Sequence, residues 1–169
     1  VSVRWLLAGH FPSDELHTLV AQLQMNLHAG LGEQGTDKVF LRSFSVLLLA
    51  ATTYYDNHKQ PFLTTAEVRD LITHVVDYLS AEDDLRGYVP GTGWAHAVAH
   101  SADLVDELVQ HRHVNADGIG ALLNAIAAKV LAPSDTIFRH DEDERLSVAV
   151  VSALARGAGP SRRGGGPPE

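Results

Sequence analysis

Apolar residues recur at spacings of three and four positions through nearly every segment of this chain, and no convincing run alternates with a period of two. Spacings of three and four place side chains on one face of an α-helix, whereas a half-buried strand needs alternation. The sequence therefore predicts an all-α fold without strands. With 169 residues, the chain has the length of one domain that buries its own core.

Breakers and capping residues divide this pattern into about seven helices. Thr64 and Glu67 have the spacing of a capping box, and Ser13, Asp37 and Asn115 are placed to cap other helices. We expect the third and fourth helices to pair. The expected helices span residues 3–8, 13–28, 37–57, 64–81, 94–112, 115–131 and 142–156.

The expected architecture is a stack of antiparallel helix pairs, HEAT-like or armadillo-like, with an irregular bundle as the alternative. Residues 1–156 form the predicted helical domain, and the Gly/Pro-rich tail 157–169 is expected to be disordered. The ends of a stack need polar caps, yet the chain begins within the apolar segment VSVRWLLAG. We expect a second helical chain to cover that end, unless the first helix packs back on the second.

Composition and charge exclude several classes of function. The chain has no cysteine, so disulfides and thiolate chemistry are excluded, as suits a cytoplasmic protein. A formal net charge of -8 disfavours nucleic-acid binding. No apolar run has the length of a membrane span, and no signal peptide is recognisable. No nucleotide-binding or nucleophile motif is present, so the sequence predicts no cofactor.

Four polar residues of the predicted helix 94–112 follow one stripe, at i, i+4, i+7 and i+11: His96, His100, Asp103 and Glu107. The stripe is either a solvated face opposite the core or the lining of a cleft. The two histidines have the spacing of metal ligands, with Asp103 as a third, but no other ligand is assured. We therefore expect no metal, and assign the histidines to hydrogen bonding or proton transfer.

The segment RGYVPGTGW, residues 86–94, leads into the start of this helix. Free backbone N–H groups and the helix dipole favour an anion there, and Arg86 and Tyr88 are close by in sequence. Alternatively, the segment is a surface loop whose glycines serve only the turn. Trp94 is placed either to wall a pocket or to pack in the core.

Arg42 lies within the apolar run VFLRSFSVLLLA. A buried guanidinium needs a partner, so we expect either a structural ion pair, with an acid of residues 141–144, or a side chain that points into a pocket.

Three segments carry a resemblance to a known family: VFLRSFS at 39–45, RGYVPGTGWAHAVAHSADLVDEL at 86–108, and DERLSVAV at 143–150 after Phe138. They resemble a bacterial family of helical proteins known only as a domain of unknown function. The resemblance covers nearly all of residues 1–155. Family members are usually longer, with additional N-terminal helices that carry acidic residues.

The chain is also similar to the smaller subunit of the two-protein cyclases that form the aziridine ring in azinomycin biosynthesis. This resemblance implies that a substrate amine displaces a neighbouring sulfate ester, without a cofactor, in a complex with a second helical subunit. A carrier protein could deliver the substrate, and we expect the base to be a carboxylate of the partner. The rival hypothesis is a non-catalytic helical-repeat module that binds a protein or peptide.

The resemblance and the spacing together suggest roles for seven residues. The sulfate side is assigned to Arg86, His96 and His100, pocket walls to Tyr88 and Trp94, the orientation of a histidine to Asp103, and further substrate binding to Arg42.

Overall fold

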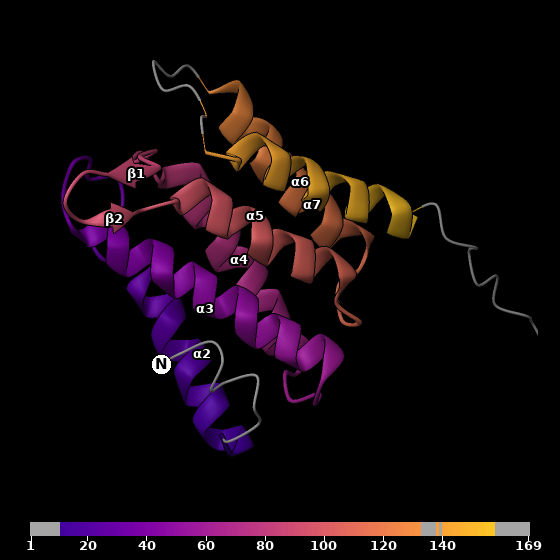
Figure 1. Cartoon of the computed structure of the whole chain (residues 1–169). Helices are drawn as coiled ribbons and strands as arrows, with labels where there is room; N and C mark the ends of the chain where they lie inside the picture. The colour runs from indigo at the N-terminus through magenta and orange to yellow at the C-terminus, as the bar shows by residue number, and fades with distance from the viewer. Residues whose placement is uncertain (1–10, 133–137, 139, 158–169) are drawn as a thin grey trace, which may run out of the picture.

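The computed structural model describes residues 11–132, 138 and 140–157, which form six α-helices and one short hairpin (Figure 1). The all-α prediction is confirmed. The expected helix 3–8 and all of the expected tail except Gly157 lie outside the described residues. The helices are α2 (Ser13–Asn26), α3 (Lys38–His58), α4 (Thr65–Ala81), α5 (Ala97–Gln110), α6 (Ala116–Leu131) and α7 (Glu142–Gly157), and the strands are β1 (Tyr88–Val89) and β2 (Gly93–Trp94).

The predicted caps hold at two of the four helix starts. Thr64 and Glu67 form the capping box of α4, and the Asn115 side chain accepts a hydrogen bond from a backbone N–H in the first turn of α6. Asp37 occupies the N-cap of α3 without a capping hydrogen bond, and Ser13 is already helical because Pro12 precedes α2. The prediction for Ser13 was therefore wrong, whereas Asp37 has the predicted N-cap position but makes no capping hydrogen bond.

The helices lie in two antiparallel layers, as expected for stacked helix pairs. Helices α3, α5 and α7 lie side by side and run in the same direction, while α4 and α6 form the second layer behind them (Figure 1). The expected pairing of the third and fourth helices was wrong, because α3 packs mainly on α5 and α2, and α4 packs mainly on α6. Helix α5 therefore lies between α3 and α7.

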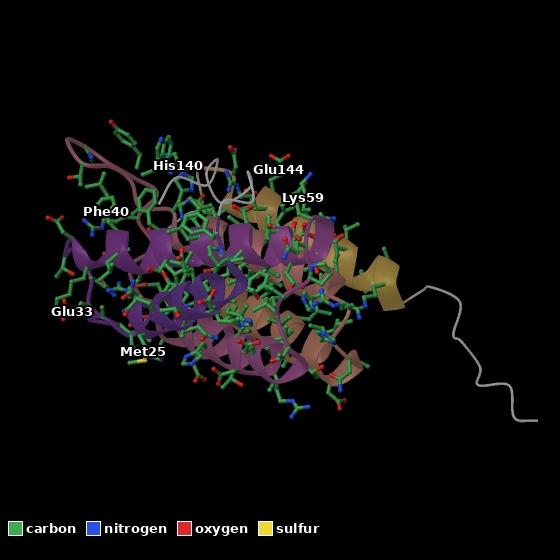
Figure 2. All side chains as sticks on the ribbon, turned by 90° about the horizontal axis from the view of Figure 1, so that it is seen from below. Met25, Glu33, Phe40, Lys59, His140 and Glu144 are labelled. Atoms are coloured by element: carbon green, nitrogen blue, oxygen red, sulfur yellow. The ribbon has the colours of Figure 1, made fainter. Side chains whose placement is uncertain are left out.

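Apolar side chains from both layers fill the space between the helices in one main core (Figure 2). The face of α5 opposite the polar stripe contributes to it through Val98, Ala102, Val105 and Val109, all of them buried. Met25 of α2 points outward on the opposite side of the molecule from His140 (Figure 2). Among the described residues, no helix is long and apolar enough to cross a membrane.

Arg42 of α3 forms a buried ion pair with Glu82, which follows α4 directly. The Arg42 side chain is fully buried, and its Nε and Nη2 donate to the two carboxylate oxygens of Glu82 at 2.6 and 2.7 Å. Its Nη1 donates to the carbonyls of Ala29 and Gly30. The expected structural ion pair is present, but its acid is Glu82 and not a residue of the segment 141–144.

The loop before α5 contains a hairpin that the sequence did not predict. Tyr88 pairs with Trp94 and Val89 with Gly93 in an antiparallel register. Pro90 and Gly91 form the turn, and Gly91 adopts a φ of 82°, which a residue without a Cβ tolerates. The hairpin returns the chain to the start of α5, where the carbonyls of residues 86 and 87 accept hydrogen bonds from the N–H groups of residues 96 and 95.

Candidate functional site

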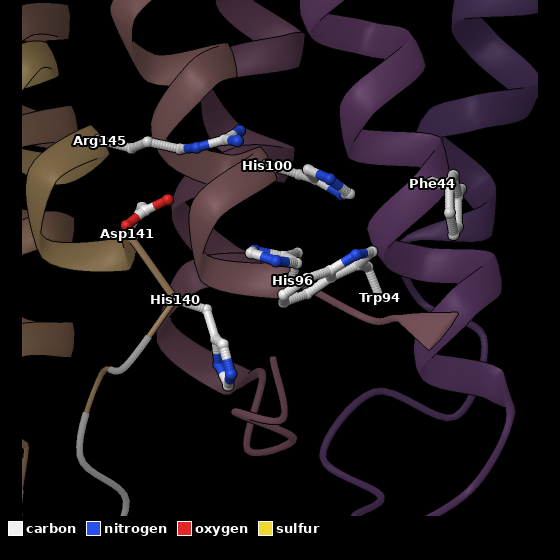
Figure 3. Close-up of a pocket in the computed structure, with 7 residues that line it drawn as sticks. All are labelled: Phe44, Trp94, His96, His100, His140, Asp141 and Arg145. Atoms are coloured by element: carbon white, nitrogen blue, oxygen red, sulfur yellow. The ribbon is translucent and has the colours of Figure 1, made fainter. Parts of the chain in front are cut away.

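A pocket of about 380 Å³ lies at the N-terminal end of α5, between α3 and α7. Phe44 enters from α3, whereas Asp141 and Arg145 enter from the start of α7 on the opposite side, with the histidines between them (Figure 3). The pocket is lined by Phe44, Trp94, His96, His100, His140, Asp141 and Arg145. It combines nitrogen donors and one carboxylate with two aromatic walls.

His96 is the residue immediately before α5, and its backbone is left-handed, with φ 51° and ψ 35°. Residues other than glycine seldom adopt this backbone conformation. The His96 ring lines the pocket. Only 9% of His96 is exposed, and its buried Nδ1 has no hydrogen-bond partner in the described part of the chain. Burial lowers the pKa of His96 below its ordinary value. An unpaired polar atom in a buried position is uncommon in folded proteins and is typical of functional sites.

His100 lies one turn further along α5 and stacks on His96, with ring centroids 5.8 Å apart and planes inclined by 24°. Its Nδ1 lies 3.1 Å from the carbonyl oxygen of Ser43 on α3. A carbonyl only accepts, so Nδ1 carries the hydrogen and the neutral ring keeps a lone pair on Nε2. Burial lowers the pKa of His100 to about 4. His100 is therefore neutral at physiological pH.

The first turn of α5 adds the positive end of a helix dipole to this site. The first hydrogen bond of the helix runs from the N–H of His100 to the carbonyl of His96. The N–H groups of Ala97, Val98 and Ala99 have no acceptor among the residues described, and no side chain caps the helix. Three unpaired N–H groups at a buried helix start favour an anion nearby.

Arg145 supplies the guanidinium of the pocket, and Asp103 holds it in place. Arg145 Nη1 donates to Asp103 Oδ2 at 2.6 Å, leaving its other N–H groups for a ligand. Burial raises the pKa of Asp103, and the charge of Arg145 offsets part of that effect. Asp103 thus orients an arginine, whereas the sequence hypothesis had it orient a histidine.

His140 closes the lower side of the pocket in Figure 3, supported by Glu142 and Gly87. The buried carboxylate of Glu142 accepts a 2.8 Å hydrogen bond from the backbone N–H of His140. Its other oxygen lies 3.9 Å from Nδ1 of the His140 ring. A Cβ at Gly87 would overlap the His140 ring. The hairpin entry and the start of α7 therefore determine together where this imidazole lies.

The hairpin places Trp94 as an aromatic wall of the pocket. The Trp94 ring lies 4.4 Å from the His96 ring and 5.1 Å from the His140 ring, between centroids, and Trp94 is 47% exposed. Tyr88, its cross-strand neighbour, packs edge-on against the indole from outside the pocket lining. Of the two positions considered for Trp94, a pocket wall or the core, the structure has it in the pocket lining, and Tyr88 packs against it.

Two predicted binding residues lie away from the pocket. Arg42 is buried in its ion pair with Glu82, as described above. Arg86 donates from Nε and Nη2 to the buried carboxylate of Asp84, at 2.7 Å in each case, and from Nη2 to the carbonyl of Thr36. These contacts anchor the loop between α4 and the hairpin and leave the Arg86 side chain outside the pocket lining.

The polar stripe of α5 divides between two hollows. His96 and His100 line the pocket described above, whereas Asp103 and Glu107 line a second cavity of about 300 Å³ beside Tyr54 of α3. Glu107 accepts a 3.0 Å hydrogen bond from the side chain of Asn57. In the described residues, no group of three or more His, Asp or Glu side chains is arranged to share a metal ion.

Four of the seven lining residues were not among the predicted site residues: Phe44, His140, Asp141 and Arg145. Phe44 is one of many apolar residues in α3, and nothing in the sequence marks it as exposed. The other three belong to the run HDEDER, which resembles an ordinary charged helix start. The histidine and arginine at the two ends of this run, His140 and Arg145, were the only sequence signal that it contributes to a site.

Comparisons with known proteins identify the family of this chain without naming an activity. A family model described as "Protein of unknown function (DUF2785)" matches residues 27–162. The match includes the whole pocket. No curated protein and no solved structure matches the chain.

Proposed function

We propose, on the premise that this chain belongs to the DUF2785 family of proteins of unknown function, that it is the smaller subunit of an aziridine-forming cyclase. The substrate is a vicinal amino sulfate. Its amine nitrogen forms a bond to the neighbouring carbon while the bond from that carbon to the ester oxygen breaks. Sulfate leaves with the electron pair, and the ring nitrogen then loses its proton to a carboxylate.

The observation that carries the proposal is the position of His96, which lines the pocket together with Arg145 at the positive end of α5. A sulfate ester presents several acceptor oxygens, and the negative charge on them grows as the carbon–oxygen bond breaks. Donors and a helix dipole that are already in place stabilise that charge without reorganising. Because Nδ1 is buried, His96 would donate to the leaving group through the N–H of its other ring nitrogen, Nε2.

Phe44 and Trp94 give the pocket apolar walls on the side of α3. They would hold the carbon skeleton and keep water from the reacting carbon. Ring closure needs the amine in line with the leaving oxygen, so a fixed conformation contributes much of the rate.

Asp141 is the carboxylate that the pocket contributes from this chain. The sequence hypothesis placed the base on a partner, whereas we assign the ring proton to Asp141, which lines the pocket. Its side chain is exposed, so a proton on it exchanges with water after the reaction. We expect Asp141→Asn to reduce turnover more than Asp143→Asn, because Asp143 is exposed in the first turn of α7 and does not line the pocket.

Exposed apolar residues around the pocket support a second subunit. Phe44, Trp94 and Tyr88 are about half exposed, and Leu41 lies one turn before Phe44. Clustered apolar side chains at the mouth of a polar pocket are typical of a covered surface. A helical partner over them would close the pocket and exclude water from it.

The proposal is tested with the chain co-expressed with a helical protein encoded beside it. The purified complex is incubated with 2-aminoethyl sulfate, and free sulfate and aziridine are measured by ion chromatography and mass spectrometry. We expect both products in equal amounts, and a large loss of both with His96→Phe or Arg145→Gln. Sulfate release without ring closure, or full activity of both variants, contradicts the proposal.

A non-catalytic interaction module is the second candidate function. Val148, Val151 and Leu154 are exposed on the side of α7 that faces away from the core, and they suit protein binding. This function predicts that Val151→Asp abolishes partner binding, that His96→Phe has no phenotype, and that the complex has no cyclase activity.

A further inference from the structure

His96 and His100, two of the three histidines that line the pocket, differ in their hydrogen-bonding partners. We propose that His100 Nε2 accepts a hydrogen bond from the substrate amine, so that the pocket recognises an amine and a sulfate on neighbouring carbons as a pair. This inference rests on the proposed function, and it names which end of the substrate His100 binds. The sequence hypothesis placed both histidines on the sulfate side.

The contact with α3 determines the character of His100. The Ser43 carbonyl is an obligate acceptor, so the hydrogen at Nδ1 is committed to it over 3.1 Å. No described residue donates to Nε2, although His100 is only 8% exposed. The groups that face the ring are Phe44 from α3, His96 from α5 and Arg145 from α7. Burial, with smaller contributions from His96 and Arg145, outweighs the Ser43 hydrogen bond and lowers the pKa of His100 to about 4, so the ring stays neutral.

A neutral His100 cannot bind the sulfate through Nε2, because a lone pair and a sulfate oxygen repel each other. An amine N–H is the complementary group. The anion then occupies the donors at His96, Arg145 and the start of α5, and the amine lies one helical turn further along. The stacked rings, 5.8 Å apart, thus mark two subsites within reach of one small molecule.

The same contact helps the proposed reaction. As the nitrogen–carbon bond forms, positive charge develops on the nitrogen, and an acceptor at its N–H stabilises that charge. A hydrogen bond at the N–H also directs the nitrogen lone pair toward the carbon. His100 does not take the proton, because a group with a pKa of about 4 is too weak a base for an amine. His100 is a substrate-binding residue, and the carboxylate remains the proton acceptor.

The test compares two probes on the full chain by calorimetry: 2-aminoethyl sulfate and ethyl sulfate, which lacks the amine. Wild-type protein should bind the amino probe about tenfold more tightly, as expected for one hydrogen bond to a charged donor. His100→Asn places its amide donor near the position of Nδ1, keeps the bond to Ser43 and removes the Nε2 acceptor. It should lose the preference. His100→Gln, whose amide reaches the position of Nε2, should retain part of it.

A second measurement does not depend on a variant. In protein labelled with ¹⁵N histidine at neutral pH, Nε2 of His100 should resonate as an unprotonated nitrogen. It should shift with 2-aminoethyl sulfate and not with ethyl sulfate. An unchanged preference in His100→Asn, or a protonated Nε2 in the free chain, overturns the inference. If neither sulfate probe binds while the ¹⁵N spectrum shows the expected tautomer, the proposed anion site fails, and the assignment of the amine to His100 fails with it.

Discussion

Arg145 Nη1 lies 2.6 Å from Asp103 Oδ2, so a carboxylate in the middle of α5 holds a guanidinium that enters the pocket from α7. Both side chains are partly exposed, so the pair itself contributes little to folding stability. Its effect lies in fixing where the guanidinium points. Asp103 therefore influences the pocket without lining it.

Arg145→Gln should weaken the binding of ethyl sulfate by about tenfold or more, because it removes a charged donor. Asp103→Asn should weaken it less, since the arginine remains but is held less firmly. Calorimetric titration measures both effects. Arg69→Gln removes the same charge from an exposed position on α4 and should bind as wild type does. Equal losses in Arg69→Gln and Arg145→Gln would indicate a general charge effect and no specific contact.

Acidification should destabilise the fold through His100. Its folded-state pKa is about 4, below the ordinary value of 6.5, so the unfolded chain binds more protons between these two values. This contribution to the free energy of unfolding is fully present above pH 6.5, and about 3 kcal/mol of it is lost as the pH falls to 4. Urea unfolding at neutral and acidic pH measures the change.

His100→Asn has no group that titrates in this range and should show a weaker pH dependence. A residual slope of the same sign should remain, because burial also lowers the pKa of His96 and His111. Equal pH dependence in wild type and variant would show that His100 is not held neutral by the fold.

Gly87→Ala should displace His140, since the added Cβ would meet the imidazole, and should weaken both folding and sulfate binding. The matched control is Gly120→Ala on α6, where a Cβ meets nothing within 4 Å. That substitution should stabilise the helix by about 0.5 to 1 kcal/mol. Thermal unfolding and calorimetry distinguish the two. A Gly87→Ala protein with unaltered sulfate affinity would show that His140 does not contribute to the site.

Glu82→Gln should destabilise the protein by about 3 to 5 kcal/mol, because it leaves the buried guanidinium of Arg42 without its counter-ion. The double variant Arg42→Met with Glu82→Leu should recover much of this loss, since it removes both charges together. Urea titration measures the stability. The double variant should bind sulfate as tightly as wild type. A large loss of affinity would show that Arg42 contributes to binding.

Local signals in the sequence were enough to predict the six described helices. The capping box at Thr64 and Glu67 involves residues three positions apart, so it forms wherever the helix forms. The start of a helix shortly after the segment RGYVPGTGW likewise follows from the glycines and the proline of that segment. These features depend on neighbours in sequence.

The rest of the site depends on which helices become neighbours in space. Arg145 reaches the pocket because α7 packs on α5, and Phe44 because α3 packs on the other side. No local pattern encodes that arrangement. Arg86 was assigned to the site although it pairs with Asp84, two residues away. The sequence does not show that the Asp84 carboxylate is buried and therefore holds the guanidinium. The hairpin was missed because each strand has only two residues, too few for an alternating pattern.

Helix α5 packs on α3 along one side and on α7 along the other. Its central amides cannot open to solvent unless both interfaces separate, so in hydrogen-exchange experiments they should be among the slowest to exchange and should report global unfolding. Of the pocket histidines, His100 belongs to this same helix and His96 directly precedes it. Exchange protection in α5 would therefore show in one experiment whether a variant still has a folded site.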